Sequence, residues 1–215
     1  MKKAVIESIS ENKIVVIVRG IAKEKLIPLA EAMYEGGIRL LEITYSANKA
    51  VSDEDTAANI AALAKHFEGR MFIGAGTVLS EEQVQLTKDS GGKFIISPDV
   101  NEAVIKKSVE LGLVSMPGAL TPTEITAADR AGADFVKLFP ITNLGIDYVK
   151  AVRAPLSHIK MIAVGGIHDG NMKDYLNAGV CGFGIGSNIT DKKLIEAGDY
   201  AGITALAKKY VEAIK

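Results

Sequence analysis

Apolar residues in this chain gather in short, nearly continuous runs that alternate with longer amphipathic stretches. The run at residues 13–19 (KIVVIVR) is typical of a parallel strand covered on both faces, because it lacks the apolar–polar alternation of a half-exposed strand. Residues 23–34 instead carry apolar side chains at helical spacing and are followed by Gly36-Gly37, where a helix would end. Together they predict one strand–helix unit, and the pattern recurs to the end of the chain.

Eight strands and the helices between them follow from this pattern. The strands are predicted at residues 13–19, 39–44, 71–77, 94–98, 114–118, 134–140, 160–166 and 182–186. The helices are predicted at residues 23–34, 56–67 and 200–214, from Ser80, Glu102 and Pro122 onward, and before the first strand up to about Ser10. Ser80 and Gln83 have the spacing of a capping box, and Pro122 suits a first helical turn.

Glycines mark the joints of this series, between a predicted helix and the next strand, where a left-handed residue ends many helices. These glycines are Gly37, Gly92, Gly112, Gly132 and Gly179. No linker or change in composition divides the chain, so residues 1–215 are predicted to form a single domain. The fold class is α/β, and eight strand–helix units in this length predict a closed (β/α)₈ TIM barrel with a short extra N-terminal helix. An open, doubly wound sheet is the alternative, because strand counts from sequence can err.

The composition limits the possible partners. The chain has 215 residues, 48% of them hydrophobic, and a formal net charge of −1. This near-neutral balance disfavours nucleic acid or an anionic membrane surface as a partner. No apolar run approaches the roughly 20 residues that cross a bilayer, and Glu7 interrupts what would be the apolar part of a signal peptide. With a single cysteine, Cys181, which we expect in the core, the sequence predicts a protein in a reducing, cytoplasmic setting.

One lysine stands in the middle of an apolar strand, at residues 134–140 (DFVKLFP). Side chains alternate along a strand, so Phe135, Lys137 and Phe139 share one face. An ammonium buried there costs on the order of several kcal/mol unless it is paired or neutralised. Two interpretations stay open. The lysine is structural and reaches an edge or a buried carboxylate, or its pKa is lowered so that it attacks a carbonyl as a free amine.

Other polar residues are expected near this lysine, because the functional residues of a barrel lie where its strands end. Those at such positions are Arg19, Glu42, Thr44, Thr77, Ser97, Gly165, Gly166, Gly186 and Ser187. Glu42 stands in an apolar strand, and a buried carboxylate is as costly as a buried lysine. Glu42 is therefore either the ion-pair partner of Lys137 or a group that moves protons beside it, through a water molecule.

Two glycine pairs end the last two strands. Gly165-Gly166 follows the seventh, and Gly184-Ile185-Gly186-Ser187 closes the eighth and leads into a predicted short helix that reaches Leu194. Glycine lets backbone N–H groups approach a phosphate, and a helix amino end adds a favourable dipole. The loops after strands seven and eight are also the usual phosphate site of such barrels. The sequence therefore predicts a phosphate site here.

The remaining motifs give weaker evidence for a functional site. Gly74-Ala75-Gly76 lacks the third glycine of a dinucleotide fingerprint, because that position is Leu79, and Ser97 stands where the ribose-binding acid would be. The three histidines lack the spacing of metal ligands, so no metal site is expected. The acidic residues 53–55 are expected in a solvated loop that leads to a helix.

A set of motifs extends over nearly the whole chain. In chain order they are Gly36-Gly37, Leu41-Glu42-Ile43-Thr44, Gly74-Ala75-Gly76-Thr77-Val78, Ser97-Pro98, Met116-Pro117-Gly118, Thr121-Pro122-Thr123-Glu124, Lys137-Leu138-Phe139-Pro140 and Gly165-Gly166-Ile167. Taken together and in this order, they resemble the KDPG/KHG aldolases. These are class I lyases that split 2-keto-3-deoxy-6-phosphogluconate (KDPG) or 4-hydroxy-2-oxoglutarate (KHG).

The resemblance implies a (β/α)₈ barrel, usually a homotrimer, that works without a metal or an organic cofactor. It implies that Lys137 forms a Schiff base with the keto substrate and that Glu42 is the general acid/base. Thr77 would lie beside the pyruvate carboxylate and Arg19 near the phosphate. The phosphate-binding loops would contain Gly165, Gly166, Gly186 and Ser187. The substrate would be a phosphorylated 2-keto acid cleaved to pyruvate and glyceraldehyde-3-phosphate, or KHG cleaved to pyruvate and glyoxylate.

Two positions depart from the family pattern. Many members carry an arginine shortly after the position of Glu42, next to the pyruvate carboxylate, whereas residues 45–48 here are Tyr-Ser-Ala-Asn. The residue before Gly165 is threonine in typical KDPG enzymes; Val164 here is similar to members that act on the galactose epimer, KDPGal. Two alternatives to an aldolase stay open: a phosphosugar isomerase or epimerase with Glu42 as base, and a non-catalytic protein that binds phosphometabolites.

Overall fold

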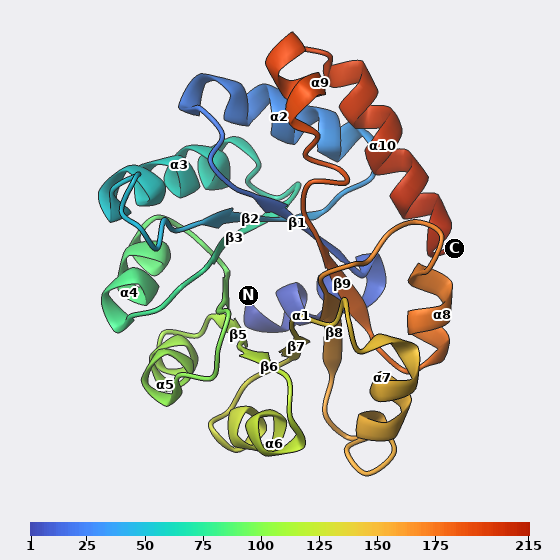
Figure 1. Cartoon of the computed structure of the whole chain (residues 1–215). Helices are drawn as coiled ribbons and strands as arrows, with labels where there is room; N and C mark the ends of the chain where they lie inside the picture. The colour runs from blue at the N-terminus through green and yellow to red at the C-terminus, as the bar shows by residue number, and fades with distance from the viewer.

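Parallel strands form a barrel at the centre of the molecule, and helices surround it (Figure 1). The computed structural model describes residues 1–215. The strands are β1 (Ile14–Val18), β2 (Leu40–Thr44), β3 (Phe72–Gly76), β4 (Phe94–Ile96), β5 (Val114–Met116), β6 (Gly118–Ala119), β7 (Val136–Leu138), β8 (Met161–Val164) and β9 (Gly182–Ile185). The helices are α1 (Lys2–Asn12), α2 (Lys23–Glu35), α3 (Asp53–His66), α4 (Glu81–Asp89), α5 (Glu102–Glu110), α6 (Pro122–Arg130), α7 (Gly145–Arg153), α8 (Met172–Asn177), α9 (Lys192–Ala197) and α10 (Tyr200–Ala213). The predicted TIM-like barrel with an extra N-terminal helix is confirmed.

The ring of strands is completed through one interrupted strand. The strand order is β5-β4-β3-β2-β1-β9-β8-β7-β6, so β5 pairs with β4 and β6 pairs with β7. Pro117 separates β5 from β6 and has no N–H to donate to a ladder. Its carbonyl still accepts a hydrogen bond of 2.9 Å from the backbone N–H of Lys137. The strand predicted at residues 114–118 is therefore two short strands, and the barrel is nearly closed.

Buried side chains form two apolar layers, one inside the barrel and one between the strands and the surrounding helices. Neighbouring residues of one strand enter different layers. Val15 packs inside and Val16 outside, and Phe135 packs inside and Val136 outside. Both faces of each strand are thus covered, which is why the strands are nearly continuous apolar runs in the sequence.

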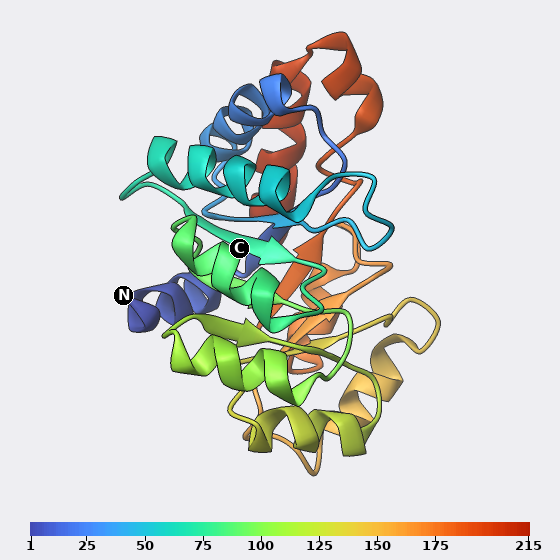
Figure 2. The same ribbon diagram turned by 90° about the vertical axis from the view of Figure 1, so that its left-hand side faces the viewer.

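Helix α1 closes the barrel at the amino ends of the strands, on the left in Figure 2. Val5 and Ile9 lie one turn apart on this helix, and both are buried. They join the interior layer together with Phe94 and Phe135. The interior is therefore reached from the opposite end, where the strands end.

Two of the predicted details need correction. Helix α3 begins at Asp53, because the hydroxyl of Ser52 accepts a hydrogen bond of 3.0 Å from the N–H of Asp55. The acidic residues form its first turn, where negative charge is favourable, and not a loop.

After α4, the left-handed residue is Gly91, with φ of 81°, and not Gly92. Gly92 has no room for a side chain, because a Cβ there would lie 2.5 Å from the side chain of the preceding helix.

The predicted capping box at α4 is only half formed. Ser80 accepts a hydrogen bond from the N–H of Gln83, but the Gln83 side chain accepts from the N–H of Leu79. A complete capping box is instead present at α6, where Thr121 and Glu124 cap each other's backbone N–H. Its helix begins at Pro122, as the sequence predicts.

Candidate active site

The side chain of Lys137 enters the interior of the barrel. Phe135, directly before β7, lies in the interior layer and Val136 in the outer one, so alternation brings Lys137 inside. Only 8% of Lys137 is exposed, and its Nζ lies 4.4 Å from the ring centroid of Phe139. Burial lowers the pKa of the Lys137 ammonium, and the nearby carboxyl of Glu42 opposes this shift.

Glu42 enters the same interior from β2. It is 2% exposed, and its Oε2 is buried without a hydrogen-bond partner. Burial raises the pKa of the Glu42 carboxyl to about 7, although the charges of Lys137 and Arg19 act to lower it. No ion pair joins Glu42 to Lys137, so the buried pair considered from the sequence is not formed. The site thus combines a carboxyl that titrates near neutral pH with a lysine whose ammonium is destabilised.

Gly76 makes room for the Glu42 carboxyl. β2 and β3 pair in register, with Glu42 opposite Gly74 and Thr44 opposite Gly76. A Cβ at position 76 would lie 2.4 Å from Oε1 of Glu42 and 2.6 Å from its Cδ. A Cβ at position 74 would lie 2.3 Å from the ring of Phe94. The two glycines, which resemble half of a dinucleotide fingerprint in the sequence, are therefore required by close packing inside the barrel.

We expect Gly76→Ala to displace the Glu42 carboxyl. A misplacement of about 1 Å can cost a catalytic group roughly 10- to 100-fold in rate, and we expect a loss of that size in kcat. Steady-state turnover measures this loss. Gly170→Ala is the matched control, because its Cβ would meet only the ring of His168, at 3.2 Å. Equal activity of the two variants would contradict the packing argument.

Thr77 and Arg19 contact each other beside Glu42. Thr77 has φ of 55°, which is rare for a β-branched residue and often marks a functional site. Its backbone N–H has no backbone acceptor, and its Oγ1 accepts a hydrogen bond of 3.4 Å from Nη2 of Arg19. A guanidinium, a hydroxyl and a free N–H therefore meet at the end of β3, and such donors suit a carboxylate.

The two glycine loops, residues 165–166 and 186–187, lie at the ends of the neighbouring strands β8 and β9. Gly165 and Gly166 both have positive φ, 95° and 69°, which other residues rarely adopt. The backbone N–H groups of both glycine loops make no backbone hydrogen bond. These loops have the free N–H groups that an anion site requires.

The helix expected directly after the second glycine loop begins later than predicted. The chain first makes a turn, in which the N–H groups of Ile189 and Thr190 donate to the carbonyl of Gly186, both at 3.0 Å. Helix α9 starts only at Lys192, and the carboxylate of Asp191 accepts hydrogen bonds from its first turn. The helix predicted to follow the glycine loop directly therefore starts later in the chain, and the N–H groups without a backbone acceptor are those of the loop itself.

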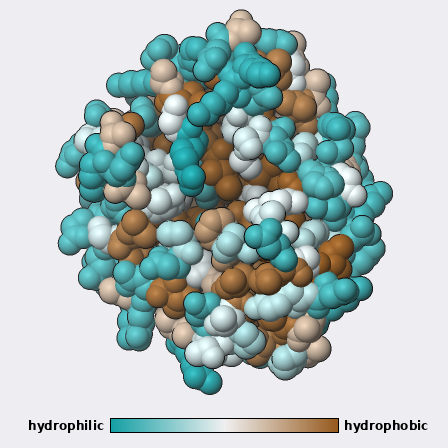
Figure 3. All heavy atoms as spheres, in the orientation of Figure 1, coloured by the Kyte–Doolittle hydropathy of each residue, from teal (hydrophilic) through white to brown (hydrophobic).

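These features share one cavity of about 480 Å³ at the carboxyl end of the barrel. Every site residue predicted from the sequence lines it: Arg19, Glu42, Thr77, Lys137, Val164, Gly165, Gly166, Gly186 and Ser187. Figure 3 looks onto this end of the molecule, where apolar side chains gather at the centre and hydrophilic ones surround them. Two polar residues considered from the sequence, Thr44 and Ser97, are buried outside the cavity lining.

The cavity also has lining residues that were not among the predicted site residues. Among them are Pro98, Phe139, Asn188, Thr190 and Lys192. Phe139 had a signal, because it shares the strand face of Lys137. Lys192 had none, because an isolated lysine in a polar stretch is ordinary surface composition.

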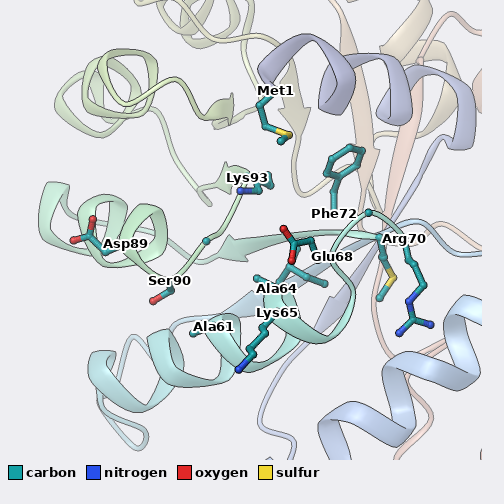
Figure 4. A pocket seen from close by; sticks show the side chains of 14 residues that line it. Met1, Ala61, Ala64, Lys65, Glu68, Arg70, Phe72, Asp89, Ser90 and Lys93 are labelled. Atoms are coloured by element: carbon teal, nitrogen blue, oxygen red, sulfur yellow. The ribbon is translucent and has the colours of Figure 1, made fainter.

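A larger cavity, of about 590 Å³, lies at the opposite end of the barrel (Figure 4). Its lining comes from the segments that lead into β3 and β4 and from Met1, and it includes Lys65, Glu68, Arg70 and Lys93. None of the predicted site residues lies there. The structure also contains no group of three or more side chains placed to hold a metal ion, and none of its helices has the length and apolarity to span a bilayer.

Comparisons with known proteins show similarity over most of the chain. A family model described as KDPG and KHG aldolase matches residues 5–206. A curated protein of Rhizobium meliloti (strain 1021), named as a probable 2-dehydro-3-deoxy-6-phosphogalactonate aldolase, is 37% identical over 190 residues, which cover 88% of this chain and 86% of the relative. The KHG/KDPG aldolase of Escherichia coli (strain K12) is 35% identical over 194 residues, covering 89% and 87%.

A solved structure extends the likeness to three dimensions. It is KDPG aldolase from Legionella pneumophila, with pyruvate captured at low pH as a covalent carbinolamine intermediate. Its TM-score to this chain is 0.84, at 26% sequence identity over 97% of each chain. The relative thus forms a covalent bond to pyruvate on the same barrel.

Proposed function

This chain belongs to the KDPG and KHG aldolase family of class I aldolases, and we propose that it cleaves 6-phosphorylated 2-keto-3-deoxy sugar acids to pyruvate and glyceraldehyde-3-phosphate. The observation that carries the proposal is the shared cavity. It holds a lysine whose ammonium is destabilised, a carboxyl with a pKa of about 7, and two groups of hydrogen-bond donors that suit anions. A keto acid with a phosphate at its far end has a ketone for the lysine and two anionic groups for the donors.

In the proposed reaction, the neutral amine of Lys137 attacks the C2 ketone of the substrate. Loss of water gives an iminium ion, which then accepts electrons. Glu42, ionised, removes the proton of the C4 hydroxyl, directly or through one water molecule. The C3–C4 bond breaks, its electron pair moves toward the iminium to form an enamine, and the aldehyde leaves. Protonation of C3 and hydrolysis of the resulting imine release pyruvate and restore the Lys137 amine.

The surroundings of the two groups support these roles. Phe135 and Phe139 provide an apolar environment that favours the uncharged amine of Lys137. A carboxyl with a pKa of about 7 exchanges protons readily at neutral pH, because both of its forms are populated. Thr77 and Arg19 would hold the keto-acid carboxylate and thereby direct the C2 carbon toward Lys137.

Parallel assays of KDPG, KDPGal and KHG test the proposal. Release of pyruvate is followed by coupling it to lactate dehydrogenase. We expect cleavage of the phosphorylated acids to have the higher kcat/KM, because KHG has no phosphate to engage the glycine loops. Absence of pyruvate from all three substrates would overturn the proposal.

We further propose that Val164 makes the enzyme accept KDPGal. Val164 ends β8, faces the barrel interior and lines the cavity. Gly184 makes room for it, because a Cβ there would lie 2.8 Å from Cγ2 of Val164. A valine offers no hydrogen bond to the C4 hydroxyl of a substrate, so neither orientation of that hydroxyl gains a partner at this position.

Val164→Thr is expected to shift the preference between epimers toward KDPG. A hydroxyl partner for a substrate hydroxyl is worth about 1–3 kcal/mol, so we expect the ratio of kcat/KM for KDPG to that for KDPGal to rise on the order of tenfold. Val164→Ala is the control, because it removes volume without adding a hydroxyl. An equal shift in both variants would assign the effect to space and not to the hydrogen bond.

A further inference from the structure

The cavity must accommodate two separate anionic groups if the proposed function holds, because the substrate carries a carboxylate at one end and a phosphate at the other. Three basic side chains line the cavity: Arg19, Lys137 and Lys192. Lys137 is the proposed imine-forming amine and acts uncharged. Arg19 and Lys192 therefore remain for the two anionic ends.

Arg19 is directed to the carboxylate end. It follows β1, which lies between β2 on one side and β9 on the other. Its guanidinium crosses toward the β2 side and donates to Thr77, which follows β3. The glycine loops lie in the opposite direction, after β8 and β9. The Arg19 side chain is thus directed away from the loops that would hold the phosphate.

Lys192 lies on the side of the glycine loops. It lines the cavity together with Gly186, Ser187, Asn188 and Thr190. The polar side chains of two of these neighbours are already engaged. Asn188 donates to the carbonyl of Ile167 at 3.2 Å and to the hydroxyl of Tyr210 at 2.8 Å. The hydroxyl of Thr190 donates to the carbonyl of Ile17 at 3.4 Å.

The ammonium of Lys192 has no partner of its own. Asp191, the carboxylate next to it in the chain, is occupied as the cap of α9, with hydrogen bonds of 2.8 and 3.1 Å from the next two N–H groups. Lys192 also borders a small neighbouring cavity with Lys25 and Glu196. The Lys25 ammonium donates to the carbonyl of Ile195 at 3.4 Å, and neither Asp191 nor Glu196 forms an ion pair with Lys192.

We propose that Lys192 is the cation for the terminal phosphate of the substrate, and that it sets the preference for phosphorylated over unphosphorylated keto acids. The free N–H groups of the glycine loops then orient the phosphate, and Lys192 supplies the charge that these neutral donors lack. This assignment rests on the proposed function for the identity of the substrate, but the anion-binding step is separable from the chemistry.

The test compares Lys192→Met with Lys193→Met. Both lysines are exposed and lie in the first turn of α9, but Lys193 lines neither cavity. Kinetics are measured with the phosphorylated sugar acid and with the same acid lacking its phosphate. We expect Lys192→Met to raise KM for the phosphorylated acid roughly tenfold with little change in kcat, because the contact persists from the bound substrate to the transition state. The KM for the unphosphorylated acid should rise far less. Lys192→Arg should return the KM for the phosphorylated acid most of the way to the wild-type value.

Calorimetric binding of inorganic phosphate separates this assignment from the proposed function. A wild-type protein that cleaves neither acid refutes the aldolase proposal, while a phosphate affinity that falls in Lys192→Met and not in Lys193→Met still supports the cation site. Equal changes in the two methionine variants, or an equal loss for phosphorylated and unphosphorylated acids, overturn the assignment of Lys192.

Discussion

Lys137→Ala is expected to abolish turnover of every keto-acid substrate. The proposed reaction needs a covalent imine, and no other lysine that lines the cavity is buried. The substitution should not unfold the protein, because burial destabilises the ammonium and alanine removes this cost. Circular dichroism and thermal denaturation check the fold, and the coupled pyruvate assay measures the loss.

Borohydride reduction in the presence of pyruvate tests the imine directly. Reduction converts an imine between Lys137 and pyruvate into a stable secondary amine, which peptide mass spectrometry locates. The wild type should gain the adduct at Lys137, and Lys137→Ala should gain none. Lys160→Ala is the matched control and should keep the adduct, because Lys160 is exposed and lies 5.5 Å from the ring centroid of Phe135. An adduct at any other lysine would remove Lys137 from the mechanism.

Much of the fold could be predicted because the barrel strands are covered on both faces. Such strands appear as continuous apolar runs, and the glycines after the helices separate one unit from the next. Two features were not readable because they depend on contacts across the fold. The interruption of the fifth strand reflects Pro117 between two different pairing partners. The choice of Gly91 over Gly92 as the left-handed residue reflects packing against Thr87.

The candidate site was predictable for a related reason. Strand alternation brings Lys137 and Glu42 inside, and the rule that sites lie where strands end adds the glycine loops. Gly76 and Lys192 escaped this reasoning: the motif that contains Gly76 indicated only half of a dinucleotide fingerprint, and Lys192 has no unusual local sequence. Gly76 matters through the Glu42 carboxyl on a neighbouring strand, and Lys192 through the turn that returns it to the cavity.

Glu42→Gln is expected to lower kcat by roughly 10²–10⁴-fold while pyruvate trapping at Lys137 persists. Glutamine keeps the shape of the side chain but cannot take the C4 proton. The wild-type kcat/KM should fall as pH decreases through about 7, because the carboxyl becomes protonated and can no longer act as a base. Glu42→Gln should lose this dependence. Near-normal turnover in the variant would remove Glu42 from the scheme.

The same substitution should alter the pH dependence of stability. The Glu42 pKa rises from 4.5 to about 7 on folding, so the associated stability is fully present below pH 4.5 and is lost as pH rises through 7. Glutamine does not ionise, so the variant avoids this loss. The free energy of unfolding of Glu42→Gln relative to wild type should therefore increase between pH 5 and pH 8, by about 3 kcal/mol at most. Urea denaturation of both proteins at the two pH values measures the difference. A difference that stays constant with pH would show that the Glu42 carboxyl has the same pKa in the folded and the unfolded chain, and burial would then not supply the base that titrates near pH 7 in the proposed reaction.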